Sequence, residues 1–323
     1  MPVITIREAL KQALREEMLR DERVFVMGED IGAYGGSYAV TKGLLDEFGE
    51  DRIRDTPIAE GAIVGVAMGA AVGGQRPVAE LMTINFSLLA IDQIINHAAK
   101  MHHMFGGQWS VPLVVRTACG WGQLSATHSQ SLEVMFAHIP GLKVTFAGTP
   151  YDAKGMLKSA IRDPDPVVFI EHANIYGVKG EVPDGEYLVP LAKSDIKRQG
   201  KDLTIVTYGR MLQTSLEAAE TLAQDGIDLE VVDLRTLRPL DMKPVYESVR
   251  KTNRAVIVTE EWRSFGVGAE IAARIGEECF DWLDAPVSRV GAEEVPLPYA
   301  RNVEQEALPW AKDIIAAVKA AVA

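Results

Sequence analysis

The chain alternates short apolar runs with longer segments in which apolar residues recur at helical spacing. This alternation predicts right-handed crossovers and largely parallel sheets, so the fold class is α/β. In the first half, the pattern predicts helices over 5–20, 87–105 and 151–162, and strands over 24–27, 77–82, 111–116, 141–146 and 167–171. In the second half, it predicts helices over 211–224, 242–251 and 267–278, and strands over 203–208, 229–234, 255–259 and 287–290.

The composition changes between the two halves. Glycine, proline and mixed charges gather around residues 177–200, which is typical of a linker. We therefore predict a domain over 1–178, a linker over 179–200 and a second domain over 201–323. A chain of 323 residues is long enough for two domains with full cores.

One stretch, from Asp55 to Gly73, combines a polar turn, a single carboxylate at Glu60 and an apolar helix. Its glycines at 61, 65, 69 and 73 are four residues apart and share one helical face. Each glycine costs about 1 kcal/mol of helix propensity relative to alanine. The row therefore predicts that another helix approaches this face closely.

Glu60 by itself has an ordinary interpretation, because acidic residues are common in first helical turns and complement the helix dipole. A capping box from Thr56 would need Glu or Gln at position 59, which is Ala59. Position alone favours the dipole role. Only the wider pattern around Glu60 favours a role in chemistry.

Charge and cysteine content exclude some classes of function. The net charge of −12 argues against nucleic acid and anionic membranes as partners. The longest apolar run, 62–73, is too short to span a bilayer, and the N-terminus does not predict a signal peptide. Cys119 and Cys279 are far apart and lack metal-ligand spacing, so we expect a reducing, cytoplasmic setting.

Histidines and a glycine-rich loop are the other candidates for chemistry. His97, His102 and His103 have spacings that suit a metal poorly, which disfavours a metal hydrolase. The glycine-rich loop at 28–36 lacks the Walker lysine and the dinucleotide spacing. His128 follows a predicted strand in a polar loop, where it is either a proton carrier or simply solvated.

Several motifs resemble a known family. Glu60, Gly65, Val66 and Gly69 fall in the register of a motif seen across thiamine-diphosphate enzymes. Over essentially the whole chain, the sequence is similar to the β subunits of 2-oxo acid dehydrogenase decarboxylating components, of which pyruvate dehydrogenase is the best known. The motifs that carry this resemblance are Thr56-Pro-Ile-Ala-Glu-Gly61, Asn85-Phe-Ser-Leu-Leu-Ala-Ile-Asp-Gln-Ile-Ile-Asn96, His128-Ser-Gln130, His138-Ile-Pro-Gly-Leu-Lys-Val144 and Asp284-Ala-Pro-Val287.

The resemblance implies two three-layer α/β/α domains: an N-terminal pyrimidine-binding domain and a transketolase-like C-terminal domain. It implies an α2β2 heterotetramer with thiamine diphosphate held between α and β. Glu60 would hydrogen-bond the aminopyrimidine ring, Phe86 would pack on it, and Ile58 and Met82 would lie nearby. His128 would face the substrate.

The resemblance also implies a potassium site. Its ligands would be mostly backbone carbonyls, at Leu113, Ala160, Ile161, Asp163 and Asp165. Many relatives are expected to have Asn at position 165, and the aspartate here adds a negative charge. The Gly-Asp-Gly motif that usually binds magnesium and diphosphate is absent, so an α subunit should supply the Mg²⁺ ligands.

The implied reaction is oxidative decarboxylation of a 2-oxo acid. Glu60 shares a proton with the cofactor's pyrimidine ring, and the acyl group passes to a lipoyl arm of the acyltransferase component. His128 is a reasonable proton carrier for this second half. Pyruvate is the first candidate substrate, with branched-chain 2-oxo acids and acetoin as alternatives. A non-catalytic subunit of the same fold is the competing hypothesis, and the retention of Glu60, Phe86 and His128 together argues against it.

Overall fold

The computed structural model describes residues 1–323, which divide into two compact units. The first unit comprises residues 1–120 and 135–191, and the second comprises residues 121–134 and 192–323. The predicted domains had a single boundary, whereas the chain enters the second unit, returns to the first and then leaves it again. The return point lies within α5 (Glu133–Ala137).

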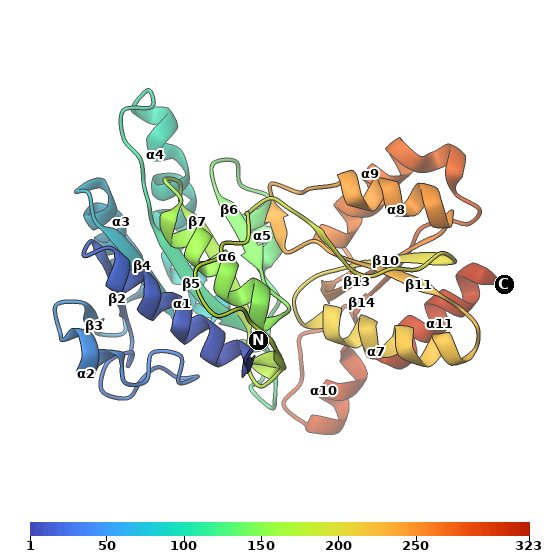
Figure 1. Cartoon of the computed structure of the whole chain (residues 1–323), viewed down its shortest axis with the longest axis horizontal. Coiled ribbons are helices and arrows are strands. Elements are labelled where there is room, and N and C mark those ends of the chain that lie inside the picture. Colours follow the sequence, from blue (N-terminus) through green and yellow to red (C-terminus); the bar gives the residue numbers. More distant parts are fainter. The chain divides into compact units, whose positions relative to one another are not determined.

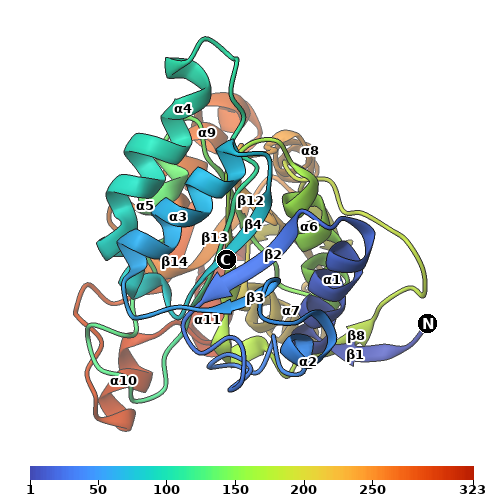
Figure 2. The same cartoon turned by 90° about the vertical axis from the view of Figure 1, so that its left-hand side faces the viewer.

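The first unit is built on a parallel sheet whose strands lie in the order β6-β7-β5-β4-β2-β3. Helices cover both faces, with α1 and α6 side by side on one face and α3 and α4 on the other (Figures 1 and 2). The predicted three layers are therefore present. The strands are β2 (Val24–Gly28), β3 (Ile53–Asp55), β4 (Arg76–Leu81), β5 (Val114–Cys119), β6 (Lys143–Phe146) and β7 (Val167–His172).

The helices of the first unit largely follow the predicted periodicity. A capping box closes the start of α1, where the Thr5 side chain accepts from the Glu8 N–H at 3.2 Å. Two short strands, β1 and β8, pair antiparallel. The bounds are α1 (Ile6–Arg20), α2 (Leu44–Phe48), α3 (Glu60–Val72), α4 (Ala99–Met104), α6 (Pro150–Arg162), η3 (Ala173–Ile175), β1 (Val3–Thr5) and β8 (Lys179–Glu181).

The single helix predicted over 87–105 was wrong in detail. The segment consists of a 3₁₀ helix η1 (Ile84–Ala90), a π-helix η2 (Gln93–Ala98) and then α4. The Thr83 side chain caps η1 and accepts from the Asn85 N–H. Apolar spacing alone does not distinguish these helix types, because all three place residues three to five apart on one face.

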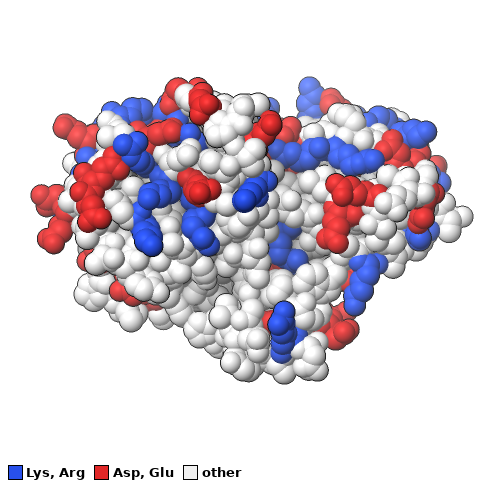
Figure 3. Space-filling view, turned by 60° about the horizontal axis from the view of Figure 1, so that its bottom comes forward, with Lys and Arg blue, Asp and Glu red and all other residues white.

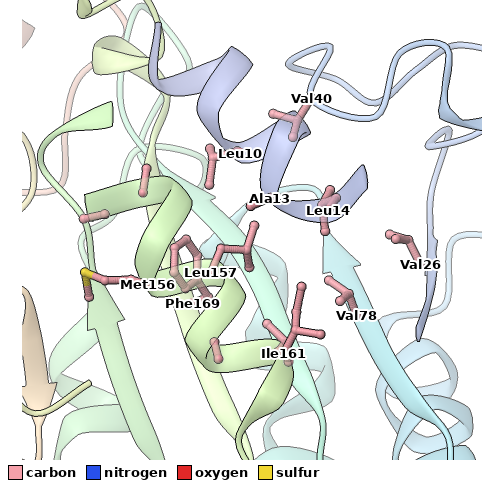
Figure 4. Packing of buried hydrophobic residues seen from close by; sticks show 14 of the residues in the cluster. Leu10, Ala13, Leu14, Val26, Val40, Val78, Met156, Leu157, Ile161 and Phe169 are labelled. Carbon is pink, nitrogen blue, oxygen red and sulfur yellow. The ribbon is translucent and has the colours of Figure 1, made fainter. Parts of the chain in front are cut away.

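The core of the first unit fills the space between the sheet and the helices α1 and α6. Figure 4 shows Leu157 of α6 beside Phe169 of β7, and Leu14 of α1 near Val78 of β4. Beyond β8 the chain stays on this unit, because Val189 packs tightly on α6 at Gly155. A Cβ at Gly155 would lie 2.5 Å from Val189 Cγ2, which explains the glycine there.

The second unit is a five-stranded sheet in the order β14-β13-β10-β11-β9, antiparallel only at β9. Within this unit, α7 packs with α11, and α8 packs with α9 (Figure 1). The strands of this sheet are β9 (Asp195–Arg198), β10 (Leu203–Thr207), β11 (Leu229–Asp233), β13 (Ala255–Trp262) and β14 (Ser288–Ala292). A further short strand, β12 (Thr236–Arg238), is not part of it. The helices are α7 (Arg210–Gln224), α8 (Lys243–Thr252), α9 (Val267–Cys279), η4 (Phe280–Trp282), α10 (Arg301–Ala307) and α11 (Ala311–Val322).

The surface carries charges of both signs. Figure 3 shows lysines and arginines interspersed with acidic residues on the face that it views. None of the helices combines the length and the apolar character that crossing a bilayer requires.

Candidate functional site

Glu60 lies at the first residue of α3, with 3% of its surface exposed. The N-cap residue of α3 is Ala59, which makes no side-chain cap hydrogen bond. Ile58, two residues earlier, is 80% exposed. The chain therefore places a recessed carboxylate beside an exposed apolar side chain.

The other residues predicted to hold the cofactor lie on elements that pack against α3. Met82 follows β4, Phe86 lies on η1, and both are half-buried. Helix α3 contacts both β4 and η1. The structure thus brings together the elements that carry Ile58, Glu60, Met82 and Phe86.

A second buried carboxyl group, Glu29, lies close enough to Glu60 for the two charges to interact. Burial, followed by the negative charge of Glu60, raises the pKa of Glu29 above its usual value. Glu29 Oε1 is buried without a hydrogen-bond partner. An unpartnered acceptor beside a recessed carboxylate fits a site that binds a polar ring.

These residues fit the pyrimidine half of thiamine diphosphate, because they offer a buried carboxylate and adjoining apolar surface. They do not fit the diphosphate half. No group of three or more His, Cys, Asp or Glu side chains could hold a metal ion, and no Gly-Asp-Gly is present. The first unit therefore offers part of a cofactor site.

A buried charge network that sequence reasoning missed lies in the same sheet. Arg116 donates to Glu171 through Nε to Oε1 (2.5 Å) and through Nη2 to Oε2 (2.7 Å), and its Nη1 donates to Glu80. The Tyr176 hydroxyl donates to Glu171 Oε2 at 2.6 Å. Burial raises the pKa of Glu80. Burial by itself lowers the pKa of Arg116, but the negative charges of Glu171 and Glu80 outweigh it and raise that pKa above its usual value. Its signal in the sequence was a charged residue within each of three largely apolar strands, β4, β5 and β7.

The oxygens predicted to bind potassium already have donors. Lys143 Nζ lies 2.6 and 2.8 Å from the two Asp163 oxygens and 3.0 Å from Asp165 Oδ2. Arg76 Nη1 donates to the carbonyls of Ile161 at 2.8 Å and Asp163 at 3.3 Å. Backbone N–H groups occupy the remaining two: Val167 donates to Leu113 O, and Asp163 donates to Ala160 O.

Two side-chain cations, Lys143 and Arg76, therefore contact oxygens of residues that the resemblance assigns to potassium. The ammonium group of Lys143 also neutralises the extra charge of Asp165. The potassium site remains a prediction from the resemblance.

His128 lies in the second unit, in the segment 121–134, and its side chain is exposed. Its Nδ1 is 2.9 Å from Thr127 Oγ1. The start of the segment is held by Glu304 of α10, which accepts from the N–H groups of Gly122 at 3.1 Å and Gln123 at 2.9 Å. The segment is thus a structured loop of the second unit rather than a free one.

Trp121 and Arg210 strengthen this attachment. The Arg210 guanidinium lies over the rings of Trp121 and Trp310, 5.4 and 5.2 Å from their centroids, and donates to Glu260. Trp121 Nε1 donates to the same Glu260 carboxylate at 3.4 Å. Such cation–π contacts contribute about 0.5–1 kcal/mol each when exposed and about 2 kcal/mol when desolvated.

Comparisons with known proteins agree with this architecture. Residues 3–179 match the transketolase pyrimidine binding domain family, and residues 192–314 match the transketolase C-terminal domain family. A solved split gene transketolase, described as an inactive beta4 tetramer, superposes with a TM-score of 0.81 at 25% identity. The alignment covers 99% of this chain and 98% of that chain.

Relatives are similar over nearly their full length. The chain is 49% identical over 323 residues to the pyruvate dehydrogenase E1 component subunit beta-2, mitochondrial, of Oryza sativa subsp. japonica, covering 98% of this chain and 86% of the relative. It is 48% identical over 317 residues to the pyruvate dehydrogenase E1 component subunit beta of Rickettsia felis, covering 98% and 97%.

A third relative is named for another substrate. The chain is 47% identical over 308 residues to the 2-oxoisovalerate dehydrogenase subunit beta of Bacillus subtilis, covering 94% of each. These identities and coverages confirm the resemblance found in the motifs. The chain therefore belongs to the family of 2-oxo acid dehydrogenase beta subunits, with the two-domain fold of the transketolases.

Proposed function

We propose that the chain is the β subunit of a thiamine-diphosphate-dependent 2-oxo acid dehydrogenase that acts on pyruvate. With an α subunit it decarboxylates the 2-oxo acid oxidatively and passes the acyl group to a lipoyl arm. The observation that carries the proposal is Glu60, a carboxylate buried at the start of α3 beside apolar residues that line a partial site.

Glu60 is the acid–base residue of this half-site. Its carboxylate would hydrogen-bond a ring nitrogen of the aminopyrimidine when the cofactor is bound. Ile58, Met82 and Phe86 orient the ring and exclude water from it. Thiamine diphosphate, when bound, supplies the electron sink for the loss of carbon dioxide.

His128 is the proton carrier for acyl transfer. Its ring is exposed on a loop of the second unit, where a substrate can reach it, and Thr127 fixes the orientation of Nδ1. When one sulfur of the lipoyl disulfide takes the acyl group, the S–S bond breaks and the other sulfur needs a proton, which a positioned histidine can supply.

An α subunit completes the site. Magnesium and diphosphate need dedicated oxygen ligands and donors, and this chain offers no group that supplies them. The exposed face of α3 supports close approach of another helix: Val66 is 59% exposed, and a Cβ at Gly69 would meet nothing within 4 Å. We infer an α2β2 heterotetramer that docks with a lipoyl acyltransferase.

A branched-chain 2-oxo acid is the second candidate substrate. The observation in its favour is the relative of Bacillus subtilis, named a 2-oxoisovalerate dehydrogenase subunit, at an identity close to that of the pyruvate dehydrogenase subunits. Acetoin is the remaining alternative within the same chemistry.

The decisive experiment is reconstitution with the α subunit and an assay of acyl transfer to a lipoyl domain from pyruvate, 2-oxoisovalerate and acetoin. Carbon dioxide release is measured in parallel for the two 2-oxo acids, with and without the lipoyl domain. Turnover of pyruvate well above that of the others supports the proposal. Faster turnover of 2-oxoisovalerate would instead support the branched-chain substrate. If the Glu60→Gln variant kept full activity, the proposed role of Glu60 would be contradicted.

A further inference from the structure

The end of the segment 121–134 is held by a different group from its beginning. Glu133, its penultimate residue, accepts a hydrogen bond from the Tyr208 hydroxyl at 3.0 Å, and Tyr208 follows β10. Glu261 of β13 lies near both, with Oε1 accepting from the Gly268 N–H at 3.0 Å. Glu133 is five residues beyond His128, so its contacts define where the histidine loop ends.

The charges in this cluster do not balance. Glu133 and Glu261 are 1% and 2% exposed, and Glu260 is buried beside them. The cation of the cluster, Arg210, donates to Glu260 and to the carbonyl of Pro309 at 3.2 Å. Its positive charge therefore serves Glu260, while Glu133 and Glu261 face each other and the neutral Tyr208 hydroxyl.

The surroundings leave room for about one water molecule at most. The outer oxygens of Glu133 and Glu261, both Oε2, are buried without a hydrogen-bond partner, as is Ser129 Oγ. A cavity bordered by Ser129, Ser131, Glu260 and Glu261 measures about 10 Å³, roughly the space that one water molecule needs. Two ionised carboxylates cannot be solvated there, so at least one is neutral.

The acidities agree with this geometry. Burial raises the pKa of Glu133 to about 7, with the charge of Glu260 adding to the effect. Burial, followed by the charge of Glu133, raises the pKa of Glu261 to about 8. A proton is thus held in the pair at neutral pH, where an exposed glutamate would have lost it.

We propose that Glu133 is a positioning residue for His128. As a neutral acid beside Glu261, it fastens the end of the 121–134 segment to Tyr208, and loss of its proton loosens the loop that carries the histidine. The consequence for His128 rests on the role that we proposed for it in acyl transfer, whereas the loosening itself does not.

The direction of the pH effect follows from linkage. In the fastened state Glu133 titrates at about 7, whereas in a loosened, solvated state it returns towards 4.5. Below about pH 4.5 Glu133 is protonated in both the fastened and the loosened state, and above about pH 7 it is ionised in both. The opening equilibrium therefore rises by up to about tenfold per pH unit within the window and levels off above the pKa of the pair.

Hydrogen exchange of the full chain tests the loosening without reference to activity. Peptides that cover 121–134 are followed from about pH 5.5 to 9, corrected for intrinsic base catalysis. We expect protection to fall about tenfold or more across this range in the wild type and to stay within about twofold in Glu133→Gln, which is always neutral. In Glu133→Ala, the segment 121–134 should be unprotected over the whole pH range. In the control Glu277→Gln, which removes an exposed carboxylate of the same unit, its protection should follow that of the wild type.

Two outcomes would overturn the proposal: the same pH dependence in Glu133→Gln as in the wild type, or full protection of the segment in Glu133→Ala. The link to His128 is tested in the reconstituted enzyme. Glu133→Gln should broaden the alkaline side of the pH profile of acyl transfer and leave that of decarboxylation unchanged. If Glu133→Gln altered hydrogen exchange but left the pH profile of acyl transfer unchanged, the positioning role would be refuted. If the reconstituted wild type showed no turnover, the proposed function would be refuted, and the hydrogen-exchange result alone would decide this inference.

Discussion

Replacing Arg116 by methionine should destabilise the first unit severely, because one guanidinium serves two buried carboxylates. It binds both oxygens of Glu171 and also Glu80, and all three side chains are at most 10% exposed. Removing one partner of a buried ion pair costs about 3–5 kcal/mol, since the other charge is left uncompensated. With two carboxylates left behind, we expect Arg116→Met to fall at the upper end, about 5 kcal/mol.

The loss of stability in Arg116→Met should grow as the pH rises. The pKa of Glu80 is already raised by burial, and loss of the arginine raises it further above the unfolded value. Glu80 does not lower the free energy of unfolding while it is protonated in both the folded and the unfolded state. The cost develops as the pH rises from the unfolded pKa, near 4.5, towards the raised folded pKa. The variant should therefore be closest to the wild type at about pH 5 and furthest from it at about pH 8.

Pulse proteolysis in urea measures this on the full chain, because the cleavage pattern reports the two units separately. The triple variant Glu80→Gln/Arg116→Met/Glu171→Gln, in which no ionised group is left, should recover much of the loss. The matched control is Arg54→Met, whose partner Asp51 is fully exposed and whose loss should change stability little. A deficit below about 1 kcal/mol in Arg116→Met, or one that does not vary with pH, would refute the reasoning.

Four further predictions concern the site. Glu60→Gln should fold normally and lower turnover of the reconstituted enzyme by about 10²–10⁴, measured as carbon dioxide release; near wild-type rates would remove Glu60 from the mechanism. His128→Ala should impair acyl transfer to lipoyl domains more than decarboxylation measured with an artificial electron acceptor, and equal losses would assign it to the first half-reaction. Replacing potassium by sodium or choline should leave the melting temperature unchanged, because Lys143 and Arg76 already bind the oxygens in question; a marked drop would show that the ion displaces them. The chain without its α subunit should bind thiamine diphosphate weakly and turn over no pyruvate in calorimetric and enzymatic assays, and micromolar binding with turnover would show a complete site in one polypeptide.

The parallel sheets could be predicted well because buried strands are visible in the sequence as short apolar runs. Where the pattern was less informative, the prediction failed for physical reasons. The segment from Ile84 to Met104 keeps helical apolar spacing while its hydrogen bonding changes from 3₁₀ to π to α. The helices α10 and α11 were not anticipated, since the closing region mixes proline, charge and alanine without a clear start signal.

The candidate site was predictable only in part. Glu60 stood out because a motif surrounds it, and the structure confirms its burial at the start of a helix. The partners of Arg116 could not be found, because Glu80 and Glu171 are 36 and 55 residues away and no local pattern joins them. The same holds for Glu133 and Tyr208, which are separated by 75 residues.

The excursion of residues 121–134 into the second unit has a consequence for synthesis on the ribosome. The segment is translated before every other part of its unit, and the chain must extend from Val134 to Ala323 before that unit is complete. At 5–20 residues per second this takes roughly 10–40 s. During that time the side chains that attach the segment, such as Trp121 and Glu133, lack the residues of the second unit that they contact in the folded protein. No single cut can excise an intact second unit from this protein, and a nascent chain stalled midway would expose the loop to proteases and chaperones.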